Sequence, residues 1–164
     1  MTLPSYVDRI YSMVECLCTT VQDYTGMPLC WCGFVPGGTP AYDGCNPCSS
    51  DACGMGFVTL NNAGIGAALN NPGGARGAGN CHDPLQAQLT AGVLRCWPLE
   101  EDGSGPSTET AAEIGLLLLS DMQAIRQAVA CCYGDGTYLN GYTPIGPDGG
   151  CIGGAWTFAM DLEA

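Results

Sequence analysis

Hydrophobic residues near the start of the chain recur at the spacing of an α-helix. They step forward alternately by four and three positions, which places them on one face: Leu3, Val7, Ile10, Val14, Leu17 and Val21. Pro4 suits the first helical turn, and Gly26 followed by Pro28 suits the point where a helix ends. The pattern predicts an amphipathic helix that packs on a sheet.

Four later segments have the composition and alternation of β-strands: 29–35, 53–60, 85–97 and 151–162. Three further segments are rich in glycine, proline and small residues and predict loops: 36–50, 61–80 and 133–150. The loop at about 61–80 holds six glycines and five alanines in twenty residues. It has little to bury, so we expect it to be flexible.

A second, longer helix is predicted over 107–132. Ser107, after Pro106, suits the cap, and Glu109 suits the positive end of the helix dipole. Three leucines widen the apolar surface beyond one face and are candidates for a subunit interface: Leu116, Leu117 and Leu119. A neighbouring subunit could cover them, or the helix could be buried in its own core; the pattern leaves both open.

The predicted order is helix, three strands, helix, strand. We therefore expect one α+β domain over 1–164. Its core would be a central antiparallel four-stranded sheet, with the N-terminal helix and the long second helix packed on one face.

Charged residues are few, and most of them are acidic. Charged residues make up 12 % of the 164 residues, with four arginines, no lysine, sixteen carboxylates and a net charge of −12. Without clustered basic residues, specific nucleic-acid binding is not expected. So few charges suggest that much of the surface meets other protein, which points to an assembly subunit.

Catalytic patterns are missing from the sequence. It holds one histidine, His82, and no zinc-protease HExxH, Walker A or GxSxG motif. Cys81 precedes His82 directly, but neighbours in an extended segment point to opposite sides. We expect no enzyme activity, no catalytic residue and no cofactor.

Twelve cysteines allow three interpretations. Zinc could be held by Cys45, Cys48 and Cys53 with Cys30, although a second CxxC is missing. Some thiols could instead be small buried apolar groups. Disulfides are favoured by the even count and by the spread of the candidates: Cys16, Cys18, Cys30, Cys32, Cys45, Cys48, Cys53, Cys81, Cys96, Cys131, Cys132 and Cys151. The pairing is not deducible from the sequence.

No export signal is visible at the start, and the longest apolar run, 114–119, is too short to span a bilayer. We therefore expect no membrane partner. A cysteine-rich chain without an export signal counts against an ordinary secreted domain.

Six motifs together resemble a small cysteine-rich protein from the structural genes of long-tailed phages that infect actinobacteria: CLC (16–18), CWCG (30–33), CGMGFV (53–58), AGVLRCWP (91–98), CC (131–132) and TPIGPDGGCIGGAWTF (143–158). Such proteins belong to the head-to-tail connection. Within it, the predicted order of elements is similar to that of the tail terminator family. The motifs span nearly the whole chain, but the loop at 61–80 carries none of them.

The resemblance implies a structural protein of the virion, made in the host bacterial cytoplasm and placed at the tail–head junction. It implies a homo-oligomer, a hexameric ring, that caps the tail tube, ends its polymerisation and joins it to the head connector proteins. Genomic DNA would pass through the lumen without specific binding. The alternatives are a head–tail connector or stopper of the same neck and, more distantly, a disulfide-rich secreted or zinc-binding module.

Overall fold

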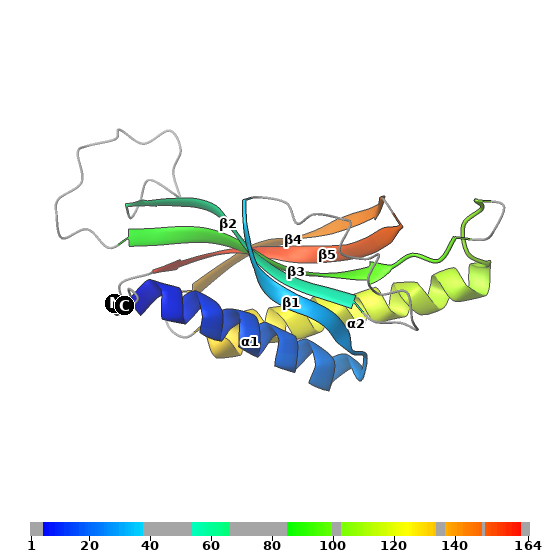
Figure 1. The fold of residues 1–164 in the computed structure, drawn as a ribbon, viewed down its shortest axis with the longest axis horizontal. Helices are drawn as coiled ribbons and strands as arrows, with labels where there is room; N and C mark the ends of the chain where they lie inside the picture. Colours follow the sequence, from blue (N-terminus) through cyan, green and yellow to red (C-terminus); the bar gives the residue numbers. More distant parts are fainter. Residues whose placement is uncertain are drawn as a thin grey trace.

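The structure is a computed structural model, and it describes residues 5–37, 54–65, 85–99, 103–133, 137–148 and 150–161. Its described elements are, in chain order, α1 (Ser5–Thr25), β1 (Leu29–Pro36), β2 (Gly54–Ile65), β3 (Leu85–Cys96), α2 (Thr108–Cys132), β4 (Thr137–Asp148) and β5 (Cys151–Asp161). Figure 1 shows two helices lying below a long twisted sheet.

Both predicted helices form, and both end where the sequence indicated. Gly26 takes a φ of 68° after α1, and its N–H donates to the carbonyl of Gln22. This left-handed conformation is one that glycine adopts without steric cost, so the helix stops there. At the start of α2, the Ser107 side chain accepts a hydrogen bond from the N–H of Thr110 at 3.2 Å, which confirms the predicted cap.

The five strands lie in the order β1-β2-β3-β5-β4. β1 pairs with β2 in parallel, whereas β2–β3, β3–β5 and β5–β4 are antiparallel. The α+β class is correct, but the prediction of a four-stranded antiparallel sheet is wrong. The sheet has a fifth strand and is mixed.

β4 lies in the segment 133–150, for which the sequence pattern predicts a loop. It contains Gly141, Pro144 and Pro147, residues that usually interrupt strands. β4 is an edge strand, paired with β5 alone among the described strands, and its register shifts between Leu139 and Gly141 and again between Ile145 and Asp148. Edges and bulges are the places where a sheet tolerates proline.

The predicted loops at 61–80 and 36–50 are described only in part. β2 runs to Ile65, so the first five residues of the predicted loop at 61–80 are strand. The remainder of that loop, and most of the predicted loop at 36–50, lie outside the described residues.

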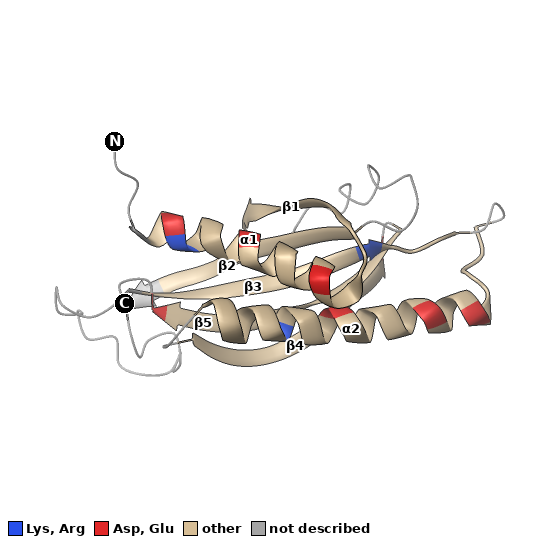
Figure 2. Ribbon diagram, turned by 90° about the horizontal axis from the view of Figure 1, so that it is seen from below, with Lys and Arg blue, Asp and Glu red and all other residues tan. Residues whose placement is uncertain are grey.

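Both helices cover the same face of the sheet, side by side, as predicted (Figure 2). The main core lies between these layers and is fully closed to solvent at Leu17 of α1, Leu89 of β3, Ile125 of α2 and Phe158 of β5. Burying a leucine or phenylalanine completely contributes about 1.5–3 kcal/mol.

A second, smaller hydrophobic cluster lies on the opposite face of the sheet. Its buried members are Met55, Phe57, Leu94, Cys151 and Ala155. The Phe57 ring lies where a side chain on Gly92 would be, so glycine at that position lets the ring pack closely against β3. The sheet therefore buries apolar side chains on both faces.

Candidate functional site

α2 has two halves with different surroundings. Its buried residues are Asp121, Ala124, Ile125, Ala128 and Val129, so none of them falls in the first thirteen residues of the helix. That first half extends beyond the end of α1, and its first turns project past the end of the sheet (Figures 1 and 2).

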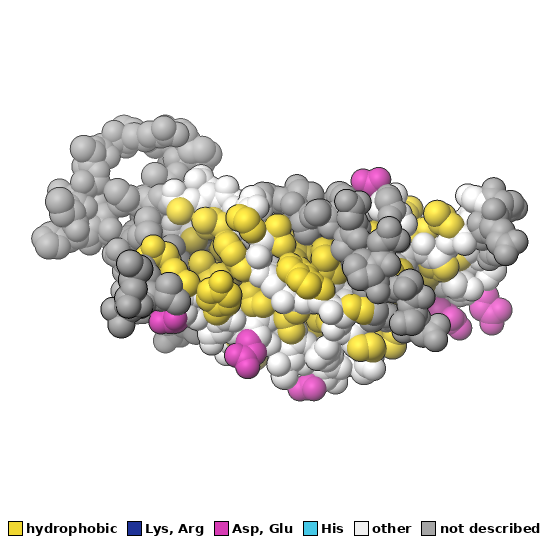
Figure 3. All heavy atoms as spheres, viewed as in Figure 1, with side chains coloured by type: hydrophobic (Ala, Val, Ile, Leu, Met, Phe, Trp, Pro, Cys, Tyr) yellow, Lys and Arg dark blue, Asp and Glu magenta, His cyan; other side chains and the backbone are white. Residues whose placement is uncertain are grey.

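The predicted interface leucines lie in this projecting half. Leu116 is 68 % exposed and Leu119 is 56 % exposed, while Leu117 is partly buried. Two of the three leucines thus point their apolar surface into solvent, and the alternative that α2 is simply buried in its own core does not hold for this half. Figure 3 shows hydrophobic atoms on the surface over this end of the molecule, as well as across the middle of the same face.

By length and composition alone, α2 could cross a membrane, and it is the one helix of the described residues for which this is so. Its second half, however, packs on the sheet and carries a buried ion pair. We interpret α2 as a core helix with one exposed end.

Two disulfides fasten α1 to its neighbours. Cys16 is bonded to Cys132 at the end of α2, and Cys18 is bonded to Cys32 in β1. The Cα atoms are 6.2 Å apart in both pairs, within the usual range for a disulfide. Cys16 and Cys18 have different partners, as expected for residues two positions apart on a helix.

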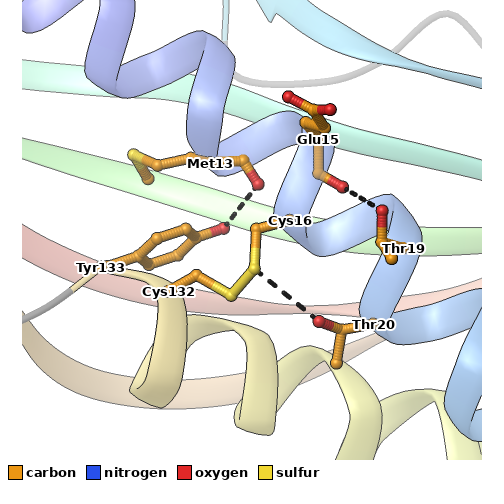
Figure 4. The surroundings of a disulfide bond; sticks show 7 residues. All are labelled: Met13, Glu15, Cys16, Thr19, Thr20, Cys132 and Tyr133. Atoms are coloured by element: carbon orange, nitrogen blue, oxygen red, sulfur yellow. Dashed lines mark hydrogen bonds between the residues drawn. A yellow bond between two sulfur atoms is a disulfide. The ribbon is translucent and has the colours of Figure 1, made fainter.

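Figure 4 shows the surroundings of the Cys16–Cys132 disulfide. The Tyr133 hydroxyl donates to the carbonyl of Met13 at 3.4 Å, and Cys16 lies 3.8 Å from the Thr20 hydroxyl. Burial raises the pKa of Tyr133. The end of α2 is thus held against α1 by a covalent bond and by a buried tyrosine.

Each of these disulfides borders a hollow in the surface. A hollow of about 250 Å³ lies beside Cys132, lined also by Arg9, Ser12, Met13, Tyr133 and Met160. An open one of about 600 Å³ lies beside Cys18 and Cys32, with Asp8 and Glu15 on its wall.

The other cysteines differ in their bonding state. Cys30 and Cys151 are disulfide-bonded as well, and Cys131 is a free, exposed thiol. Cys96 lies directly opposite Cys151 in the β3–β5 ladder. The remaining four candidates lie outside the described residues: Cys45, Cys48, Cys53 and Cys81.

The zinc alternative loses one of its ligands. Cys30, the proposed fourth ligand, is in a disulfide and has no thiolate to offer a metal. The other three proposed ligands are outside the described residues. Among the residues that are described, no three histidine, cysteine or acidic side chains come together as a metal site.

A buried ion pair that the sequence pattern did not predict joins the sheet to α2. The Arg95 guanidinium donates to both carboxylate oxygens of Asp121, at 2.9 and 2.7 Å, and to the carbonyl of Pro28 at 3.2 Å. The two side chains are 3 % and 2 % exposed. The available signal was an arginine on the apolar side of a strand and a single aspartate inside an apolar helix.

Aromatic side chains lie on the same part of the sheet. Trp156 donates its indole N–H to the carbonyl of Met122 in α2 at 2.9 Å, and the Tyr142 ring is tilted against it. Burial, and next the charge of Asp121, raise the pKa of Tyr142. Hydrogen bonds and packing thus fix the sheet against the start of the buried half of α2.

Comparison with known proteins gives no family for the chain. No protein-family model matches it, and no curated protein matches it.

Proposed function

We propose that the chain is a structural subunit of the head–tail neck of a long-tailed phage. It forms a ring, a hexamer, that caps the tail tube, ends its polymerisation and joins it to the head connector. The observation that carries this proposal is the projecting half of α2, where Leu116 and Leu119 stand in solvent. An apolar surface held away from the body is suited to contacts with other subunits.

Four further features support an assembly role. The six motifs that resemble phage neck proteins are spread along the chain, and charged residues make up 12 % of it. The disulfides tie α1 to α2 and β1, which suits a particle that must stay intact outside the cell. The surplus of carboxylates suits a lumen through which DNA passes without adhering.

The disulfides also favour a second class of protein, a secreted domain. Those among the described residues suit it, because such bonds persist in oxidising surroundings. A head–tail stopper would share the location and the ring form of a terminator.

A deletion of the gene from the phage tests the proposal and separates its variants. Loss of a terminator gives tail tubes of uncontrolled length, whereas loss of a stopper gives tails of normal length beside heads that lose DNA. Mass spectrometry and cryo-electron microscopy of wild-type particles then look for a sixfold ring of this chain at the neck. Particles without the protein, with the protein in the culture medium, would favour the secreted domain.

A further inference from the structure

The outward side of α2 carries a row of exposed residues that we call the α2 seam. Its members step forward alternately by three and four positions and are all exposed: Glu109, Ala112, Leu116, Leu119, Gln123, Arg126 and Ala130. At 3.6 residues per turn, this row lies opposite the buried residues of the same helix. Such spacing is that of a helix that pairs with another helix along one line.

Charge is placed symmetrically along the α2 seam. Glu109 stands seven positions before Leu116, and Arg126 stands seven positions after Leu119. Each charge is therefore about 13 Å from the midpoint between the two leucines. The seam has an acidic end, an apolar middle and a basic end.

We propose that two copies of this protein pair through their α2 seams, antiparallel, about a twofold axis between Leu116 and Leu119. In this arrangement Leu116 of each copy packs on Leu119 of the other. Glu109 of each copy meets Arg126 of the other at the two ends of the contact. A parallel pairing would instead set like charges against each other, so the charge order selects the antiparallel one.

The body of the molecule leaves room for this contact. α1 is fastened to the far end of α2 by the Cys16–Cys132 disulfide, so it accompanies the second half of α2 and not the projecting half (Figure 2). Because the twofold axis crosses the projecting half, the two α1 helices lie at opposite ends of the dimer. Their exposed carboxylates Asp8 and Glu15, which lie away from the axis, are therefore kept apart.

A twofold contact differs from the one that closes a ring. It uses the same surface on both copies and joins two of them, whereas a ring needs a head-to-tail contact. The pairing therefore concerns the free protein and does not rest on the proposed function. A single pair of helices buries less than the roughly 800 Å² per partner of a standard interface, so we expect a dissociation constant in the micromolar range.

The test is a charge exchange on the non-reduced full-length protein, followed by sedimentation or by light scattering over a concentration series. Glu109→Arg and Arg126→Glu should each weaken the dimer about tenfold, because each turns two attractions into two repulsions. The double variant restores both pairs and should bind nearly as tightly as the wild type. The single changes shift the net charge in opposite directions, so a general charge effect cannot weaken both.

Glu15→Arg on α1 is the matched control and should leave the dimer unchanged, and Leu116→Asp should weaken it at least about 100-fold. Circular dichroism checks that each variant is folded, as expected for exposed positions. A wild type that is monomeric at every concentration would overturn the pairing. Single variants that dimerise as tightly as the wild type would also overturn it. The same holds for a double variant that dimerises more weakly than both single variants. A hexamer insensitive to the exchange would also overturn the pairing while supporting the ring.

Discussion

Arg95 and Asp121 form the one strongly polar contact described inside the main core. The contact is bidentate, and it joins β3 to the residue at which α2 turns from exposed to buried. A buried ion pair adds little net stability, because desolvation offsets the attraction, but it is costly to break on one side. Its effect here is to fix the position of α2 along the sheet.

Asp121→Ala should lower the free energy of unfolding by about 3–5 kcal/mol, because it leaves the Arg95 charge buried and unpaired. Arg95→Met with Asp121→Leu removes both charges and should recover most of that loss. Denaturant titration measures both, with Glu113→Ala on the exposed side of α2 as the control that changes little. A double variant no more stable than the single one would contradict this account.

Tyr133 makes stability depend on pH in alkaline solution. Its ring stacks on Phe158 with centroids 5.1 Å apart, and burial raises the pKa of its hydroxyl in the folded protein. In the unfolded chain the pKa of tyrosine is about 10. Below pH 10 both states keep the proton, and above it the unfolded state alone releases it, so stability is lost as pH rises above 10.

Tyr133→Phe should therefore reduce the loss of stability above pH 10 by about 1.4 kcal/mol per pH unit. At neutral pH it removes only the long hydrogen bond to Met13 and should change little. Unfolding measured shortly after a jump in pH reports the difference. Tyr138→Phe, at a position 60 % exposed, should follow the wild-type profile. An unchanged slope in Tyr133→Phe would mean that this hydroxyl is not the group responsible.

Among the elements, α1 is held both by packing and by covalent bonds. It packs on α2 and the sheet through its apolar face and is bonded to α2 and β1 by disulfides. The two bonds close very different lengths of chain, with sequence separations of 116 and 14 residues. Longer closed loops restrict the unfolded chain more.

Removing the two disulfides should therefore have unequal effects. Chain entropy predicts losses of about 4–5 kcal/mol for Cys16→Ala with Cys132→Ala, and about 3 kcal/mol for Cys18→Ala with Cys32→Ala. The two double variants delete the same atoms, so each is the control for the other in denaturant titrations. Cys131→Ala, at a free exposed thiol, should change little. Equal losses, or the reverse order, would show that local packing outweighs loop closure.

The sequence predicted those elements whose pattern is local. Both helices, β3 and β5 follow from the period of their apolar residues, and Ser107 follows from capping chemistry. β4 could not be found in this way, because an edge strand tolerates the glycines and prolines that usually mark a loop. The parallel pairing of β1 with β2 was also missed, since strand direction depends on the connection rather than on the strand itself.

The same distinction holds for the candidate site. Leu116 and Leu119 were found because an apolar surface too wide for one face is visible in the sequence. The pairing of Cys16 with Cys132 and of Arg95 with Asp121 depends on contacts between distant segments, which no local pattern encodes.

Over the whole molecule, basic side chains are few on the described surface, while acidic side chains are spread over it. Of the four arginines, Arg95 is buried and paired, Arg9 donates to the carbonyl of Asp161, and Arg126 is exposed on α2. Arg76 lies outside the described residues. Figure 2 shows acidic residues spread along both helices with few basic ones between them. The described surface therefore offers no basic patch.

This distribution predicts that the protein does not retain DNA, even at low ionic strength where attraction to phosphates is strongest. Affinity for the DNA backbone depends on the number of phosphates that basic side chains neutralise, and a net charge of −12 opposes even the first contact. Fluorescence anisotropy of labelled single- and double-stranded oligonucleotides, from low to physiological salt, measures this. Arg126→Glu should leave the result unchanged, because an isolated arginine does not form a binding site. Binding that weakens steeply with salt would reveal a basic cluster and would argue against a repelling channel wall.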